Sequence, residues 1–221
     1  MTQKQVFLGL SVGLFIFFIL FSYFVSKELF TQTDFDLTVK LQDQIPRRVD
    51  YPFSILSVLG SLEISMFFWG LLLFFCLIKK YWLAALSLTL LPLALLMELF
   101  GKLFVLHPAP PNFFYRGVIK LDVPAYYIHT DYSYPSGHVT RTAFIIFFLI
   151  TFLQLRSPKK YRLPIQLSLV FFLGVMLISR IYLGEHWTTD VIGGLLIGTS
   201  FGILAGIFIP DKKLQSRNSG S

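Results

Sequence analysis

Long apolar runs separated by short polar segments dominate the pattern along the chain. A helix needs about 20 apolar residues to cross the hydrocarbon core of a bilayer. Six runs approach or reach this length, at residues 6–25, 54–78, 82–104, 139–155, 164–181 and 191–209. The pattern therefore predicts an all-α, polytopic membrane protein of six transmembrane helices.

Two polar segments refine this topology. Residues 79–81 are the only connection between the second and third runs, which predicts a tight turn. In the first long loop, Phe35, Leu37, Leu41 and Ile45 recur at roughly helical spacing. Such spacing predicts a helix that lies in the membrane interface, although a solvated loop with incidental apolar residues is the alternative.

The composition supports a membrane protein and argues against a soluble one. The chain has 221 residues, of which 55% are hydrophobic, 17% aromatic and 14% charged. A soluble domain of this size needs more charge to cover its surface. We expect a single transmembrane domain over residues 1–213, followed by a polar tail at 214–221 that is flexible or a linker remnant.

The basic residues explain the formal charge of +7 without a nucleic-acid partner, because they lie in short loops rather than along one face. Positively charged loops tend to stay in the cytoplasm. Their distribution predicts a multi-pass protein of the cell membrane with both termini cytoplasmic.

Ionisable side chains gather in three clusters, and each cluster lies at the predicted external end of an apolar run. Such groups are costly at membrane depth, so they are functional candidates. The clusters are Lys102 with His107-Pro108-Ala109-Pro110, Tyr134-Pro135-Ser136-Gly137-His138 with Arg141, and Ser179-Arg180 with His186 and Asp190.

His186 and Asp190 are four residues apart, so a helix would place both on one face. The carboxylate could then hold one ring nitrogen and leave the other free to attack phosphorus. A polar histidine beside an ordinary first-turn acid is the alternative, and it is the better one for this pair taken alone.

Ser136 and Gly137 come directly before an apolar run, where the amides of a helix N-terminus can bind an anion. His138 could protonate a departing alkoxide. Ser and Gly are also common capping residues, so the tetrapeptide Pro135–His138 alone is weak evidence for a phosphate site.

Lys102 and Arg180 could supply the fixed positive charge that phosphoryl transfer requires. Lys102 could instead be an interfacial lysine that extends its ammonium to the membrane surface. Histidine spacings typical of metal sites, such as H-E-x-x-H, do not occur in the sequence. We therefore predict no cofactor and a metal-independent reaction.

The motifs resemble those of the type 2 phosphatidic acid phosphatases, and in particular their phosphatidylglycerophosphatase B-like members. The family's signatures are K-x6-R-P, P-S-G-H and S-R-x5-H-x3-D. The second is complete at Pro135–His138, and the third is complete from Ser179 to Asp190. The resemblance implies a core similar to the helical bundle of acid phosphatases and vanadium haloperoxidases.

The resemblance also implies a role for each matching residue. His186 would form a phosphohistidine, Asp190 would orient it, and His138 would act first as an acid and then as a base. The phosphoryl oxygens would be bound by Lys102, Ser136, Gly137 and Arg180.

The first motif departs from the family pattern, because Ala109 stands where the family has arginine. The missing guanidinium removes a bidentate contact that lysine cannot replace. Either the activity is altered, or another base such as Arg116 or His107 substitutes.

The resulting hypothesis is a membrane lipid phosphatase whose active site faces the extracytoplasmic side. Phosphatidylglycerophosphate is the favoured substrate, and phosphatidate or undecaprenyl pyrophosphate also fit. The expected partners are the lipid substrate and the bilayer, with no nucleic acid and no obligate protein partner. Because of Ala109, the alternative is an impaired or inactive relative that binds anionic lipid headgroups. Haloperoxidase activity fits poorly, since it requires vanadate.

Overall fold

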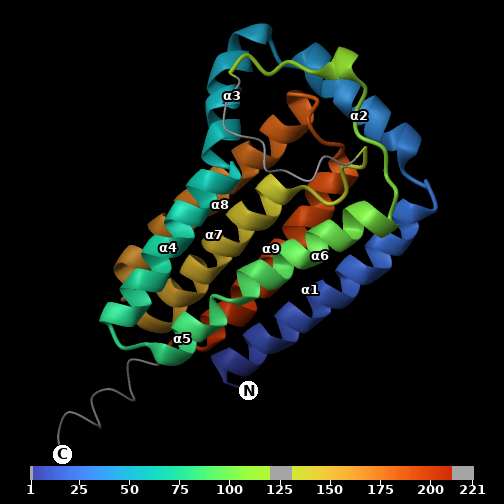
Figure 1. Cartoon of the computed structure of the whole chain (residues 1–221). Helices are drawn as coiled ribbons and strands as arrows, with labels where there is room; N and C mark the ends of the chain where they lie inside the picture. The colour runs from blue at the N-terminus through green and yellow to red at the C-terminus, as the bar shows by residue number, and fades with distance from the viewer. Residues whose placement is uncertain (1, 120–130, 211–221) are drawn as a thin grey trace, which may run out of the picture.

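The computed structural model describes residues 2–119 and 131–210, which form α-helices and no β-strand (Figure 1). The predicted tail at 214–221 lies outside the described residues. The helices are α1 (Gln3–Ser26), α2 (Thr31–Gln44), α3 (Asp50–Leu59), α4 (Leu62–Ile78), α5 (Trp82–Ser87), α6 (Leu90–Phe104), α7 (Gly137–Arg156), α8 (Lys159–Tyr182) and α9 (Thr188–Ile207), and short 3-10 helices cover Arg47–Val49 and Asn112–Phe114.

The apolar helices agree with the six predicted spans. Within residues 2–119 and 131–210, five are long and apolar enough to cross a membrane: α1, α5 with α6, α7, α8 and α9. A sixth crossing requires α3 and α4 together, and these helices are bent by 49° relative to each other. The chain is therefore a multi-pass membrane protein, as its sequence predicts.

The prediction of one helix over 54–78 is wrong, because the chain breaks between Leu59 and Leu62. Gly60 ends α3, and the Ser61 hydroxyl caps α4 by accepting from the Ile64 amide at 3.4 Å. The break has a structural consequence. A Cβ on Gly60 would lie only 3.1 Å from Cδ2 of His138, so this backbone passes directly against a predicted site residue.

Other boundaries differ less. The tight turn at 79–81 is confirmed, since α4 ends at Ile78 and α5 begins at Trp82. Helix α8 begins at Lys159 and contains Pro164, so the predicted start of that span is late by five residues.

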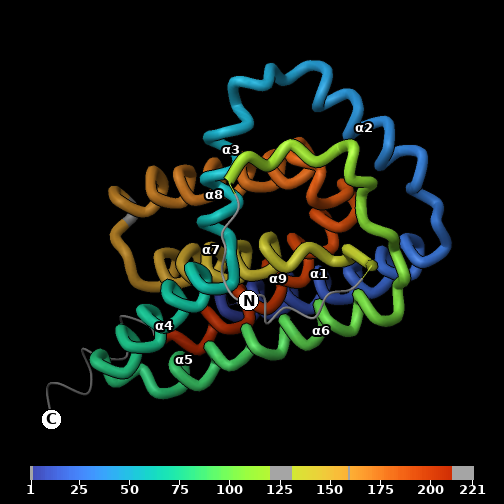
Figure 2. The backbone as a smooth tube through the Cα atoms, turned by 45° about the horizontal axis from the view of Figure 1, so that its top comes forward, coloured from blue at the N-terminus to red at the C-terminus, as the bar shows by residue number. Residues whose placement is uncertain are grey.

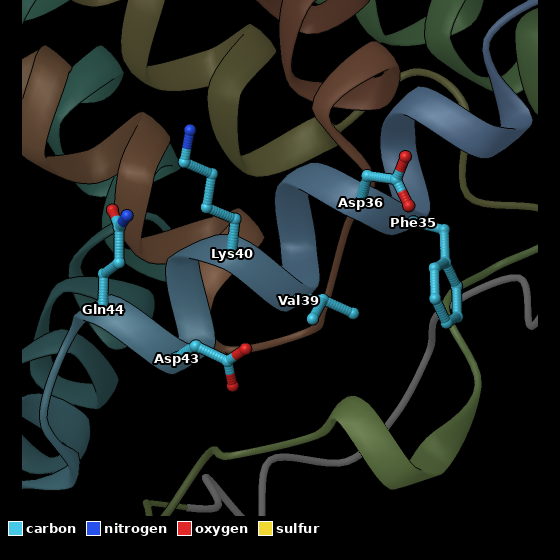
Figure 3. A pocket seen from close by; sticks show the side chains of 6 residues that line it. All are labelled: Phe35, Asp36, Val39, Lys40, Asp43 and Gln44. Atoms are coloured by element: carbon cyan, nitrogen blue, oxygen red, sulfur yellow. The ribbon is translucent and has the colours of Figure 1, made fainter.

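The predicted interfacial segment is confirmed as a helix, α2, but its inner face is polar. Asp34 and Thr38 are buried, whereas Phe35 is 41% exposed. The outer side lines a shallow cavity of about 330 Å³ that contains none of the predicted site residues (Figure 3). Helix α2 therefore brings Asp34 into the protein interior.

Helices α7 and α9 run side by side through the centre of the bundle (Figure 2). Four glycines, spaced every fourth residue along α9, face α7. A Cβ on Gly194, Gly198 or Gly202 would collide with an α7 carbonyl or the Ser136 carbonyl just before it. Small residues at this spacing let two membrane helices approach closely. The approach holds the start of α7 beside the start of α9, where two of the predicted motifs lie.

Both ends of the described chain lie at one end of the bundle, and α2 and α3 lie at the other (Figure 1). The Lys4 ammonium donates to the Ile209 carbonyl at 2.9 Å, which ties α1 to the segment after α9. The three clusters lie at the end that carries α2. Which end faces the cytoplasm stays a prediction.

Candidate active site

The third cluster is built at the start of α9. Asp190 lies in the first turn and is completely buried. Its Oδ2 accepts from the Trp187 amide at 2.9 Å and lies 3.4 Å from Nδ1 of His186, in the preceding loop. The carboxylate thus contacts one ring nitrogen of His186 and leaves Nε2 on the opposite edge of the ring.

The second cluster is bonded directly to the third. The Ser136 amide donates to the Asp190 carbonyl at 2.9 Å, just before α7 begins at Gly137. The Ser136 hydroxyl is buried and has no hydrogen-bond partner among the described residues. A buried polar atom without a partner is costly, so this hydroxyl is a candidate ligand for an oxyanion.

A carboxylate that sequence reasoning missed lies among the expected phosphate ligands. Glu98, on α6, contacts the α-carbon of Gly137 so closely that a Cβ there would overlap it. Its Oε1 accepts from the Lys102 ammonium at 2.8 Å, and its Oε2 lies 3.8 Å from Nη1 of Arg141. The spacing of Glu98 and Lys102, four residues apart on one helix, was the signal in the sequence.

Arg180, on α8, is fully buried and only partly paired. Its Nη1 donates to the Ser57 hydroxyl at 2.7 Å and to the Glu185 carboxylate. Its Nε and Nη2 are buried without partners in the described part of the chain. Sequence reasoning found Arg180 but missed its partners Ser57 and Glu185.

His138 and Arg141 both lie against the backbone of the bend after α3. A Cβ on Gly60 would lie 3.1 Å from Cδ2 of His138, and Arg141 donates to the Gly60 carbonyl at 3.3 Å. The structure therefore brings the three clusters together, as a single transferring phosphoryl group would require.

Only part of the first motif contacts the other clusters. Ala109 is exposed, and its amide donates to the Asp131 carbonyl at 3.2 Å. Its neighbours line a cavity of about 240 Å³. They are Glu28, Thr31, Asp34, His107, Pro108, Pro111 and Trp187.

The two bases that could replace the missing arginine have other partners. The Arg116 guanidinium lies 5.2 Å from the centre of the Tyr182 ring and donates to the Gln42 carbonyl at 3.0 Å. His107 is buried, and its Nδ1 lies 3.1 Å from Oδ1 of Asp190. In this structure, therefore, both bases contact other groups of the protein, and a role in place of an arginine at position 109 stays a prediction.

Comparison with known proteins establishes the family. A model of the PAP2 superfamily matches residues 80–213, which contain all three clusters. The chain belongs to the PAP2 superfamily. This result confirms the resemblance noted from the motifs.

Among curated PAP2 relatives, the chain is 41% identical over 78 residues to an undecaprenyl-diphosphatase of Sulfolobus acidocaldarius, a match that covers 34% of this chain and 33% of that protein. It is 37% identical over 73 residues to phosphatidylglycerophosphatase B of Bacillus subtilis, covering 31% of this chain and 35% of that protein. The matched segments span about a third of these relatives.

Solved PAP2 structures extend the similarity to the fold. A crystal structure of a transmembrane PAP2-type phosphatidylglycerolphosphate phosphatase from Bacillus subtilis matches with a TM-score of 0.68 at 20% identity, covering 94% of this chain and 96% of that one. The crystal structure of LpxE from Aquifex aeolicus matches with a TM-score of 0.53 at 23% identity, covering 77% of this chain and 93% of that one. These likenesses confirm the predicted fold.

Proposed function

We propose that the chain is a lipid phosphatase that hydrolyses a phosphomonoester or pyrophosphate of a membrane lipid through a phosphohistidine on His186. One observation carries the proposal: direct contacts join the three motifs, because the Ser136 amide donates to the Asp190 carbonyl and the Glu98 carboxylate contacts both Lys102 and Gly137. The joined motifs bring a nucleophile, an acid and two cations, the groups that a phosphoryl transfer needs.

The reaction proceeds in two displacements. Nε2 of His186 attacks phosphorus and forms a P–N bond, while the P–O bond to the leaving group breaks and His138 gives that oxygen a proton. Water then gives a proton to His138 and attacks phosphorus, and the P–N bond breaks to release inorganic phosphate. Asp190 keeps Nδ1 of His186 in place and stabilises the positive charge that forms on the ring.

The expected ligands of the transferring oxygens fit these steps. Arg180 offers two nitrogens without partners, Nε and Nη2, and the Ser136 hydroxyl is likewise unpartnered among the described residues. The N-terminus of α7 adds the favourable end of its dipole at Gly137. Because Lys102 and Arg180 supply positive charge, the proposed reaction requires no metal and no cofactor.

The favoured substrate is phosphatidylglycerophosphate, and phosphatidate and undecaprenyl pyrophosphate fit the same chemistry. The names of the two curated relatives support a lipid phosphate or diphosphate as the substrate. We place the site at the extracytoplasmic face, because the basic loops of the opposite end favour the cytoplasm. No obligate protein partner is needed in this proposal.

A second candidate function is an inactive relative that binds anionic headgroups. It is favoured by Glu98, whose carboxylate pairs with Lys102 and contacts Gly137, together with the absence of a guanidinium at Ala109. A substrate phosphoryl group would compete with this carboxylate for Lys102. If the carboxylate prevails, the site can still bind an anionic headgroup at its other cations without hydrolysing it.

Phosphate release by the purified chain in detergent separates the two functions. We expect turnover of one or more of short-chain phosphatidylglycerophosphate, phosphatidate and undecaprenyl pyrophosphate, insensitive to EDTA and lost in His186→Ala. Ser11→Ala is the matched control, because Ser11 is a buried polar residue between α1 and α9 and bonds the Ser200 carbonyl. Equal turnover by His186→Ala and the unaltered chain would reject the mechanism. Loss of activity in EDTA with recovery in Mg²⁺ or Zn²⁺ would reject metal independence.

A further inference from the structure

Two histidines, not one, hold the carboxylate of Asp190. His186 contacts Oδ2 at 3.4 Å, and Nδ1 of His107 contacts Oδ1 at 3.1 Å from the opposite side. The His107 side chain is 5% exposed and Asp190 is completely buried, so the contact is largely shielded from bulk water. The motif that contains Asp190 accounts for His186 alone.

The far side of His107 is also held. Its Nε2 lies 3.7 Å from Oδ2 of Asp34, a carboxylate that is 2% exposed. Asp34 is fixed in turn by Thr189, whose amide and hydroxyl donate to it at 2.9 and 2.7 Å. Helix α2 and the first turn of α9 thus clamp the His107 ring between two acids.

We infer that His107 is a positioning residue for the proposed reaction: together with Asp34 it fixes the orientation and the charge of Asp190, and so of the nucleophile His186. The inference rests on the proposed function, since it concerns the same site. It also assigns a role to the buried acid of α2 and to the loop after α6.

The balance of charge explains why two acids are needed. A protonated His107 alone would neutralise Asp190 and weaken its hold on the positive charge that forms on His186. With Asp34 on its other side, the three groups together keep one negative charge for His186. Glu28, in the turn before α2, is the remaining acid that acts on His107, and it favours the same protonated state.

The direction of the His107 pKa follows from this geometry. Burial alone lowers the pKa of His107. The hydrogen bond and charge of Asp190, joined by the charges of Asp34 and Glu28, outweigh burial, so the pKa lies above its ordinary value. The ring is therefore protonated over a wider pH range than that of a free histidine.

Two isosteric substitutions separate positioning from mere packing. An asparagine amide can replace Nδ1 of a histidine, whereas a glutamine amide reaches the place of Nε2. His107→Asn therefore keeps the donor to Asp190, and His107→Gln loses it. We expect His107→Gln to lower kcat about tenfold to a hundredfold, the effect of losing a hydrogen bond to a charged group, with KM unchanged. His107→Asn should retain most of kcat.

The pH profile of kcat/KM supplies the readout that a structural role would not move. Loss of the positive charge in His107→Gln leaves more negative charge on Asp190 for protonated His186, so the acid limb should move to higher pH. Asp34→Asn keeps the shape and removes a negative charge, so its acid limb should move to lower pH. This second variant tests the inference independently if His107→Gln does not fold.

The outcomes are distinguishable. Opposite shifts of the acid limb, with Ser11→Ala unshifted, support the inference. An active chain whose His107 and Asp34 variants keep the native kcat and pH profile overturns it and leaves the proposed function intact. Shifts in the same direction, or equal loss in the Asn and Gln variants, also overturn it. A chain that hydrolyses none of the lipid phosphates overturns the proposed function and this inference together.

Discussion

The carboxylate of Glu98 lies against the α-carbon of Gly137, at the helix N-terminus where the proposed mechanism places a phosphoryl group. Lys102, one of the proposed phosphate ligands, is 2.8 Å from this carboxylate. Glu98 therefore has the charge and the surroundings of a bound anion, and substrate must compete with it.

Glu98→Gln is expected to strengthen anion binding. The neutral amide repels a phosphoryl group less and releases Lys102 from its ion pair. The effect of one charge at this range is about 1 to 2 kcal/mol in a partly screened site, or roughly tenfold. The measurement is the inhibition constant of inorganic phosphate, with Glu63→Gln, an exposed acid on α4, as the matched control. An unchanged or higher inhibition constant in Glu98→Gln would show that Glu98 does not compete with the anion.

Ala109→Arg tests the departure in the first motif. Loss of a charge-assisted clamp of the oxyanion type typically costs about 10² to 10³ in rate, so its restoration should raise turnover by a comparable factor. The cavity of about 240 Å³ beside Ala109 gives the side chain room. Ala109→Lys should recover less, because lysine lacks the planar fork. Equal turnover in all three chains would mean that position 109 is not a phosphate ligand.

The stability of the protein should depend on pH through His107. The pKa of His107 in the folded protein is raised above 6.5, its ordinary value in an unfolded chain. The protonated ring therefore contributes its full stability below pH 6.5, and this contribution is lost as the pH rises through the pKa of the folded state. The melting temperature in detergent should therefore fall as pH is raised from about 6 to 9. His107→Asn should flatten this dependence. An identical dependence of melting temperature on pH in the two chains would contradict the ion pairs of His107 with Asp190 and Asp34.

The close approach of α7 and α9 should be intolerant of added volume. Gly198→Leu places atoms where the Thr140 carbonyl lies, and overpacking of this kind typically costs about 1 to 3 kcal/mol. Gly13→Leu is the matched control, since nothing lies within 4 Å of a Cβ built on Gly13 of α1. We expect a lower melting temperature and lower activity in the first variant only. Similar melting temperatures would show that the helices can separate without loss.

The sequence was sufficient to predict a bundle of apolar spans, because apolar length is a local property of the chain. The glycines at 194, 198, 202 and 206 were also visible as a repeat of four, and they explain how two motifs meet. The bend at Gly60 was not predictable in this way. It depends on how closely that backbone packs against His138, a contact between distant parts of the chain.

The roles of buried charges were the least accessible from the sequence. Asp34 belongs to a helix expected to lie in the membrane interface, and only the packing of α2 brings its carboxylate within 3.7 Å of His107. In the sequence, His107 lies two residues before Ala109, where the family has arginine. The sequence therefore suggested that His107 replaces that arginine. Its contact with Asp190 assigns it to the support of the nucleophile instead.

Trapping the covalent intermediate is the most direct test of the mechanism. The chain would be quenched in alkali during turnover of short-chain phosphatidylglycerophosphate, because phosphohistidine survives base, and its peptides would be examined by mass spectrometry. We predict a phosphoryl group on the peptide that contains His186, absent from His186→Ala and reduced in His138→Ala, which lacks the acid for the first step as well as the base for the second. Turnover by the unaltered chain without a phosphorylated His186 would contradict the mechanism.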